Sequence, residues 1–96
     1  MDLPPDRYET LENEWISCVE TLAQEAGLKT DMKVGHIVRG VLEACEPQEQ
    51  ALYEHLARDE AREWRERLDQ RVFPAIRRRL SDRIIMTVLH ARVSRR

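Results

Sequence analysis

Apolar side chains recur every three or four residues over the first third of the chain, which is the spacing of one buried face of an α-helix. The main positions of this first stripe are Tyr8, Leu11, Trp15, Cys18 and Leu22. Asp6 suits the N-cap, with Glu9 three residues later in capping-box spacing. Gly27 suits the left-handed residue that follows a helix. The pattern therefore predicts a helix over residues 7–26.

A second apolar stripe follows a short polar turn, and either Thr30 or Asp31 is suited to cap its start. The stripe consists of Val34, Ile37, Val38, Val41, Leu42 and Cys45. We expect a helix over residues 31–45, antiparallel to the first because the turn between them is short. Gly35 and Gly40 lie inside it and each lowers its stability by up to about 1 kcal/mol. Their presence suggests that another backbone packs closely against this helix.

Pro47 marks the start of a third predicted helix, because proline is tolerated in a first turn, where its missing N–H is not needed. The apolar line of this helix is Leu52, Tyr53, Leu56, Ala57, Ala61, Trp64, Leu68 and Val72. The line predicts a helix over residues 47–73. Its middle is strongly charged, and Arg62 and Glu66 stand four residues apart, where such a pair contributes roughly 0.2–0.5 kcal/mol. We expect a long arm with a narrow buried strip and few neighbours.

Pro74 interrupts this arm, because it cannot donate the helical hydrogen bond and its ring clashes with the preceding turn. The third helix is therefore expected to kink or end near Phe73. A fourth helix is predicted over residues 74–94. Ser81 and Asp82 form a second cap signal, so a further break there is an alternative.

Residues 83–94 are apolar around most of the predicted helix. A strand would leave neither face polar, whereas a helix gathers Arg83, Thr87, His90 and Ser94 on one stripe. A helix that is apolar over most of its circumference must be covered on most sides. The other helices are too few to cover it, so we expect a homodimer. The alternative is a four-helix monomer in which the first two helices cover the last one.

The interface predicted for this dimer lies on the fourth helix and the end of the arm. Its residues are Trp64, Leu68, Ile84, Ile85, Val88 and Leu89. Large apolar side chains of this kind contribute on the order of 1.5–3 kcal/mol each when they become fully buried.

The composition agrees with one small all-α domain. The chain has 96 residues, of which 42% are hydrophobic and 35% charged. This balance is too apolar for a disordered chain and too polar for a membrane protein. The predicted fold is a four-helix domain over residues 1–96, with residues 1–6 as an N-terminal extension. The start shows no basic and apolar signal pattern, so a cytoplasmic location is expected.

Charge is distributed unevenly, with an acidic first half and a basic end. Residues 1–48 hold ten acids and four bases, a net −6, whereas residues 70–96 hold eight arginines against one acid, a net +7. Arginines along a helix are able to follow a phosphate backbone, so DNA or RNA binding is the alternative function. Its residues would be Arg77, Arg78, Arg79, Arg83, Arg92, Arg95 and Arg96. The competing interpretation is that the basic end pairs with the acidic half.

Residues 22–42 resemble a helix-turn-helix motif at its start, where Leu22, Ala23, Ala26 and Gly27 stand in the expected order. The apolar positions of the following helix come one residue late. The recognition face would carry only Asp31, Lys33, Gly35, His36 and Arg39, which is thin for base readout. An ordinary helical hairpin is the favoured interpretation.

No motif for metal binding, cofactor binding or catalysis stands out, so we expect a protein without a cofactor or metal and not an enzyme. The three histidines and two cysteines are isolated from one another and match no metal-ligand spacing. With the hairpin turning at Gly27, Cys45 lies roughly 7 Å too far along the axis to meet Cys18. A disulfide is therefore not expected, and both cysteines are interpreted as core residues.

These observations together favour a small cytoplasmic regulatory or adaptor protein. It would act through helix-on-helix contacts with itself and with an unidentified protein partner. The small dimeric nucleic-acid-binding regulator remains the alternative.

Overall fold

The computed structural model describes residues 7–58 and 62–95, and all regular structure in these ranges is helical. The elements are α1 (Arg7–Lys29), α2 (Val34–Ala44), α3 (Glu46–Ala57), α4 (Arg62–Arg67), the π-helix η1 (Leu68–Val72) and α5 (Phe73–Ser94). The predicted fold class, a small all-α domain, is confirmed.

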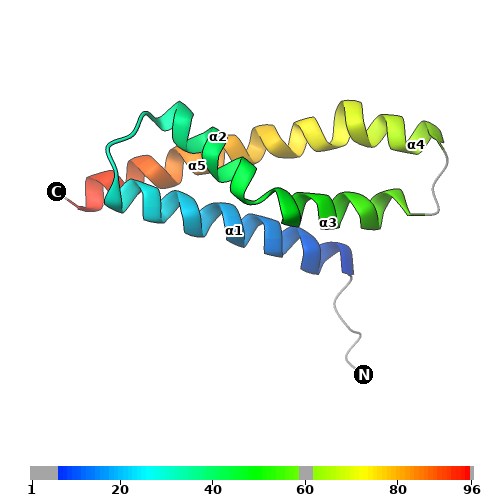
Figure 1. The fold of residues 1–96 in the computed structure, drawn as a ribbon, viewed down its shortest axis with the longest axis horizontal. Coiled ribbons are helices and arrows are strands. Elements are labelled where there is room, and N and C mark those ends of the chain that lie inside the picture. The colour runs from blue at the N-terminus through cyan, green and yellow to red at the C-terminus, as the bar shows by residue number, and fades with distance from the viewer. Residues whose placement is uncertain (1–6, 59–61, 96) are drawn as a thin grey trace, which may run out of the picture.

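The helices form three lengths that lie side by side along the long axis of the molecule (Figure 1). α1 runs in one direction, α2 and α3 return together in the other, and α4, η1 and α5 run in the first direction again. Consequently, α1 and α2 are antiparallel, as the short turn predicted. α5 packs along α1 and also contacts α2.

The core lies where the three lengths meet. Each length contributes fully buried side chains, and the largest of them are Trp15, Phe73, Leu52, Leu68 and Ile84. The ring of Phe73 stacks on Trp15 with 5.9 Å between centroids, and Tyr53 meets the same ring edge-on at 5.3 Å. Three aromatic rings from α1, α3 and α5 thus join the lengths at one place.

The hairpin of α1 and α2 turns later than the sequence predicts. α1 continues through Gly27 to Lys29, and α2 begins only at Val34, with Lys33 at its N-cap position and no side-chain cap. Gly27 is therefore a buried helical residue and not a C′ residue, and Thr30 and Asp31 do not cap α2. The turn occupies residues 30–33, where Thr30 donates back to the carbonyl of Ala26.

Close backbone packing occurs at a different glycine from those predicted. A Cβ atom at Gly27 would lie 2.7 Å from the Cβ of Ala91 and 2.8 Å from the carbonyl oxygen of Val88. Apart from the adjoining backbone of α2 itself, no atom of the described residues lies within 4 Å of the corresponding position at Gly35 or Gly40. The absence of a side chain at Gly27 therefore lets α1 approach α5 closely, and the prediction for α2 is wrong.

The prediction of a single helix over residues 47–73 is also wrong. α3 ends at Ala57, Arg58 adopts an extended backbone with φ −64° and ψ 132°, and α4 begins at Arg62. α3 and α4 run in opposite directions (Figure 1). Pro47 does stand in the first turn of α3, as predicted. The predicted pair of Arg62 and Glu66 forms within α4 at 3.6 Å.

The irregularity predicted at Pro74 is present as a π-helical turn. η1 precedes α5, and the N–H of Phe73 donates to the carbonyl of Leu68, five residues back. The wider turn accommodates a proline that has no N–H and would clash with a regular preceding turn. α5 then continues without a break at Ser81, whose hydroxyl donates to the carbonyl of Arg77 at 2.8 Å.

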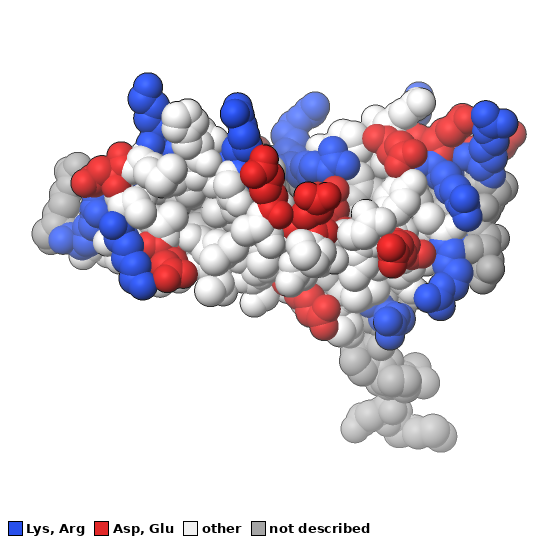
Figure 2. Space-filling view, in the orientation of Figure 1, with Lys and Arg blue, Asp and Glu red and all other residues white. Residues whose placement is uncertain are grey.

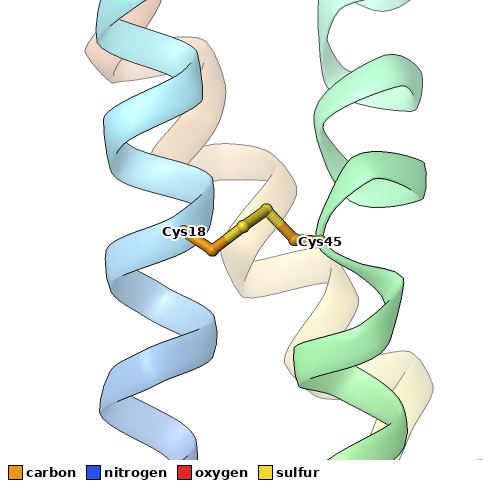
Figure 3. Close-up of a disulfide and its surroundings, with 2 residues drawn as sticks. All are labelled: Cys18 and Cys45. Carbon is orange, nitrogen blue, oxygen red and sulfur yellow. A yellow bond between two sulfur atoms is a disulfide. The ribbon is translucent and has the colours of Figure 1, made fainter.

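A disulfide joins Cys18 of α1 to Cys45, between α2 and α3, and overturns the prediction that these cysteines are separate (Figure 3). Their Cα atoms are 5.9 Å apart. The prediction placed the turn of the hairpin at Gly27. Because the turn actually lies at residues 30–33, whose middle is also halfway between the two cysteines, the two cysteines face one another.

Candidate interaction surface

α5 divides into a buried face and an exposed face. The buried positions are Phe73, Ile76, Leu80, Ile84, Val88 and Ala91. They recur every three or four residues, so they form one stripe that faces the other helices. The remaining helices therefore cover the inner face of α5 and leave its outer face open.

Apolar side chains occupy part of this outer face. Met86 is 65% exposed, Leu89 45% and Val93 70%. Their spacing of three and four residues places them on one side of the helix, in a row that we call the outer stripe. The other large exposed apolar residues in the described ranges are Leu28 and Met32. Leu28 lies at the end of α1, and Met32 lies in the turn that follows it.

The structure places the six predicted interface residues in three different environments. Leu68, Ile84 and Val88 are fully buried within the single chain, so their apolar surface is already covered. Ile85 is half-buried, and Leu89 belongs to the outer stripe.

Trp64 is half-buried and packs against the core. Its indole N–H donates to the carbonyl of Leu56 at 2.8 Å. The carbonyls of a last helical turn have no partner inside the helix, so Trp64 satisfies one of them in α3. Its position is explained by the fold of this chain alone.

Sequence reasoning missed Met86 and Val93 as surface residues. The available signal was their spacing with Leu89, which places all three opposite the buried stripe. Because apolar residues cover most of this helix outside its one polar stripe, hydropathy alone does not show which apolar side faces the core.

Most arginines proposed for nucleic-acid binding make contacts within the chain. Arg77 pairs with Glu49 at 3.0 Å, and Arg83 pairs with Glu20. The basic end thus pairs with carboxylates of α1 and α3. Such exposed pairs add little stability, but each one neutralises a cation that a phosphate would otherwise meet.

The last arginines of α5 hold the turn between α1 and α2. Arg92 donates to the carbonyls of Thr30 and Met32, and Arg95 pairs with Asp31. Arg78 and Arg79 are exposed and show no ion pair with any residue in the described ranges. Arg96 lies outside the described residues.

The residues of the resembled helix-turn-helix face are exposed, but the turn is not that of the motif. Gly27 lies within α1 and packs against α5, whereas the motif would place it in the turn.

Figure 2 shows both signs of charge crowded at the end formed by α3 and α4, and an uncharged area over the middle of α1. No continuous basic face is visible on this side of the molecule.

A shallow groove of about 820 Å³ runs along α1. Ser17, Cys18, Leu22 and Gln48 are among the residues that line it. Cys18 is half-buried here, whereas Cys45 is fully buried. The disulfide therefore joins a residue that lines the groove to a residue of the core.

Within the described residues, no group of three or more His, Cys, Asp or Glu side chains is arranged to hold a metal ion. None of the helices in those ranges combines the length and the apolar content needed to cross a membrane. Comparison of the chain with protein-family models, with curated proteins and with solved structures finds no match.

Proposed function

We propose that this chain is a small, non-catalytic regulatory or adaptor protein that works through helix-mediated contacts, first of all with a second copy of itself. The outer stripe of Met86, Leu89 and Val93 is the observation that carries the proposal. Contiguous exposed apolar side chains on a small domain are typical of an interaction surface. The face opposite the stripe is already occupied by the core.

A second copy is the occupant that fits this surface. In an antiparallel pair of α5 helices centred between Met86 and Leu89, the two stripes cover each other. Asp82 of one copy would then lie beside Val93 of the other, next to the basic last turn. The stripe spans only about 10 Å along the helix, so the interface belongs to the weak end of the size range. We expect a dissociation constant on the order of 10–100 µM.

Sedimentation equilibrium over a wide concentration range tests the dimer. The chain should pass from monomer to dimer, and Met86→Glu or Leu89→Glu should abolish the transition by introducing a charge at the centre of the interface. Ala75→Glu is the matched control, since Ala75 is exposed in the first turn of α5 and outside the stripe. A monomer mass at every concentration, or a dimer that survives both stripe variants, would contradict the proposal.

Nucleic-acid binding is the less supported function, because Arg77, Arg83 and Arg95 already pair with carboxylates of the chain. We expect no measurable binding of a labelled duplex at physiological salt. Binding that weakens steeply as salt rises would instead favour the regulator that contacts phosphates.

The cytoplasmic location remains part of the proposal and is constrained by the disulfide. Structural disulfides persist in oxidising compartments, whereas those of cytoplasmic proteins are mostly transient. A cytoplasmic protein would therefore carry the bond between Cys18 and Cys45 reversibly. Acid quenching of host cells followed by thiol alkylation measures the fraction that is oxidised.

A further inference from the structure

The disulfide lies at the point where α2 is held to the rest of the molecule. Cys45 is the single residue between α2 and α3, with φ −97° and ψ 13°, and its sulfur is bonded to Cys18 of α1. The bond therefore fixes the end of α2 against the middle of α1 (Figure 3).

α2 is weakly held by other means. It contributes Ile37 and Val41 as buried side chains, and its Val34, Val38 and Leu42 are half-buried against the core, whereas the longer α5 contributes six buried side chains. Gly35 and Gly40 lower its intrinsic helix stability. The start of α2 shows no side-chain cap.

The turn before α2 is anchored by polar contacts that are exposed or partly buried. Arg95 pairs with Asp31, whose side chain is 88% exposed, and Arg92 donates to backbone carbonyls. Exposed ion pairs contribute roughly 0–1 kcal/mol. Besides the packing of its apolar side chains on the core, the covalent bond at the far end of α2 is thus its main attachment.

Of the two bonded cysteines, only Cys18 reaches the surface. Cys18 lines the groove along α1 and is half-buried, whereas Cys45 is fully buried. A thiolate has the readier approach to the sulfur of Cys18. Attack there forms a mixed disulfide and expels Cys45 as the leaving thiolate.

From these contacts we propose that the Cys18–Cys45 bond is a redox latch whose reduction releases α2 from α1 while α1, α3 and α5 remain packed. A dithiol supplies the two electrons. Its first thiolate bonds to Cys18, its second thiol displaces Cys18, and the dithiol leaves as a cyclic disulfide. Two protons convert both cysteines to thiols. Release exposes the apolar side of α2, which carries Val34, Ile37, Val38, Val41 and Leu42.

The latch is independent of the α5 dimer, and hydrogen exchange of the full chain tests it with and without dithiothreitol. Reduction should raise the exchange rate of α2 amides by at least about tenfold, because the loop that the bond closes regains its freedom. Amides in the centre of α5 should change little. Faster exchange in α2 than in α5 distinguishes local release of α2 from a loss of stability of the whole fold.

The double variant Cys18→Ser, Cys45→Ser is the control for reagent effects. If it folds, its α2 should exchange rapidly with and without dithiothreitol. The reduced natural chain provides the test even if this variant fails to fold. Equal acceleration of exchange in α2 and α5 would overturn the proposal, because it would show that the bond stabilises the whole fold. Unchanged exchange in α2 would also overturn it, because it would show that the bond is not the main attachment of α2.

Discussion

Gly27 shows how one missing side chain determines the spacing of two helices. A methyl group there would overlap the Cβ of Ala91 at 2.7 Å and approach the Cα of Val88 at 3.1 Å. Two of the three nearest atoms belong to the backbone of α5, which cannot rotate away as a side chain can. Steric overlap therefore outweighs the gain in helix propensity that alanine brings.

We predict that Gly27→Ala lowers the free energy of unfolding by about 1–3 kcal/mol. Gly40→Ala, in open space, should raise it by up to about 1 kcal/mol. Urea denaturation of the two variants and the natural chain measures both. A stabilising Gly27→Ala would show that α1 and α5 are not in close contact.

Tyr53 is linked to Asp69 across the contact between α3 and η1. The hydrogen bond that its hydroxyl gives to this carboxylate raises the pKa of Tyr53 above 10.0, with burial and the negative charge as further causes. The phenolate would lose the bond and be repelled by the carboxylate. Because the folded-state pKa is raised, this stabilisation is complete below pH 10 and is lost as the pH rises through the folded-state pKa.

Ultraviolet absorbance of the phenolate follows this titration. The chain has two tyrosines, and a hydrogen bond with Glu12 raises the pKa of Tyr8 in the same direction. Asp69→Asn should lower the pKa of Tyr53 toward its usual value and leave that of Tyr8 in place. An unchanged titration in Asp69→Asn would contradict the assigned bond.

At the scale of elements, Trp64 connects α4 to the end of α3. We predict that Trp64→Phe, which removes the indole N–H and keeps an aromatic ring, costs about 1–2 kcal/mol of stability. The variant should still dimerise like the natural chain, because Trp64 serves the fold of one copy. Urea denaturation together with sedimentation separates the two effects. If the folded variant no longer formed the dimer, Trp64 would belong to the dimer interface.

The sequence pattern predicts the wrong register for the hairpin of α1 and α2. A glycine after a periodic stretch is typical of a helix end, but Gly27 serves the packing of α1 on α5. This contact joins residues far apart in the chain, so local spacing does not reveal it. The misplaced turn also concealed the disulfide, because the pairing of Cys18 with Cys45 depends on where the hairpin reverses.

The reversal between α3 and α4 had no local signal. Residues 58–61 read Arg, Asp, Glu and Ala, without glycine or proline, and they favour a continuous helix. Folding back lets Trp64 reach the carbonyl of Leu56 and lets Leu68 enter the core. Tertiary packing therefore overrides local propensity here, whereas the signals of Pro47 and Pro74 were local and were interpreted correctly.

At the scale of the whole molecule, the basic and acidic parts of the chain meet within one copy. The pairs of Arg77, Arg83 and Arg95 join α5 to α3, to α1 and to the turn before α2. The charge gradient seen in the sequence is thus partly neutralised inside the fold. The surface that the fold of one copy leaves uncovered is the apolar outer stripe of α5.

Methyl NMR spectra recorded over a dilution series test most directly whether the outer stripe joins two copies. The methyl signals of Met86, Leu89 and Val93 should shift together as the concentration rises, while those of the buried Val19 and Ile84 stay in place. Stripe signals that do not move at any concentration, or shifts confined to other helices, would contradict the account.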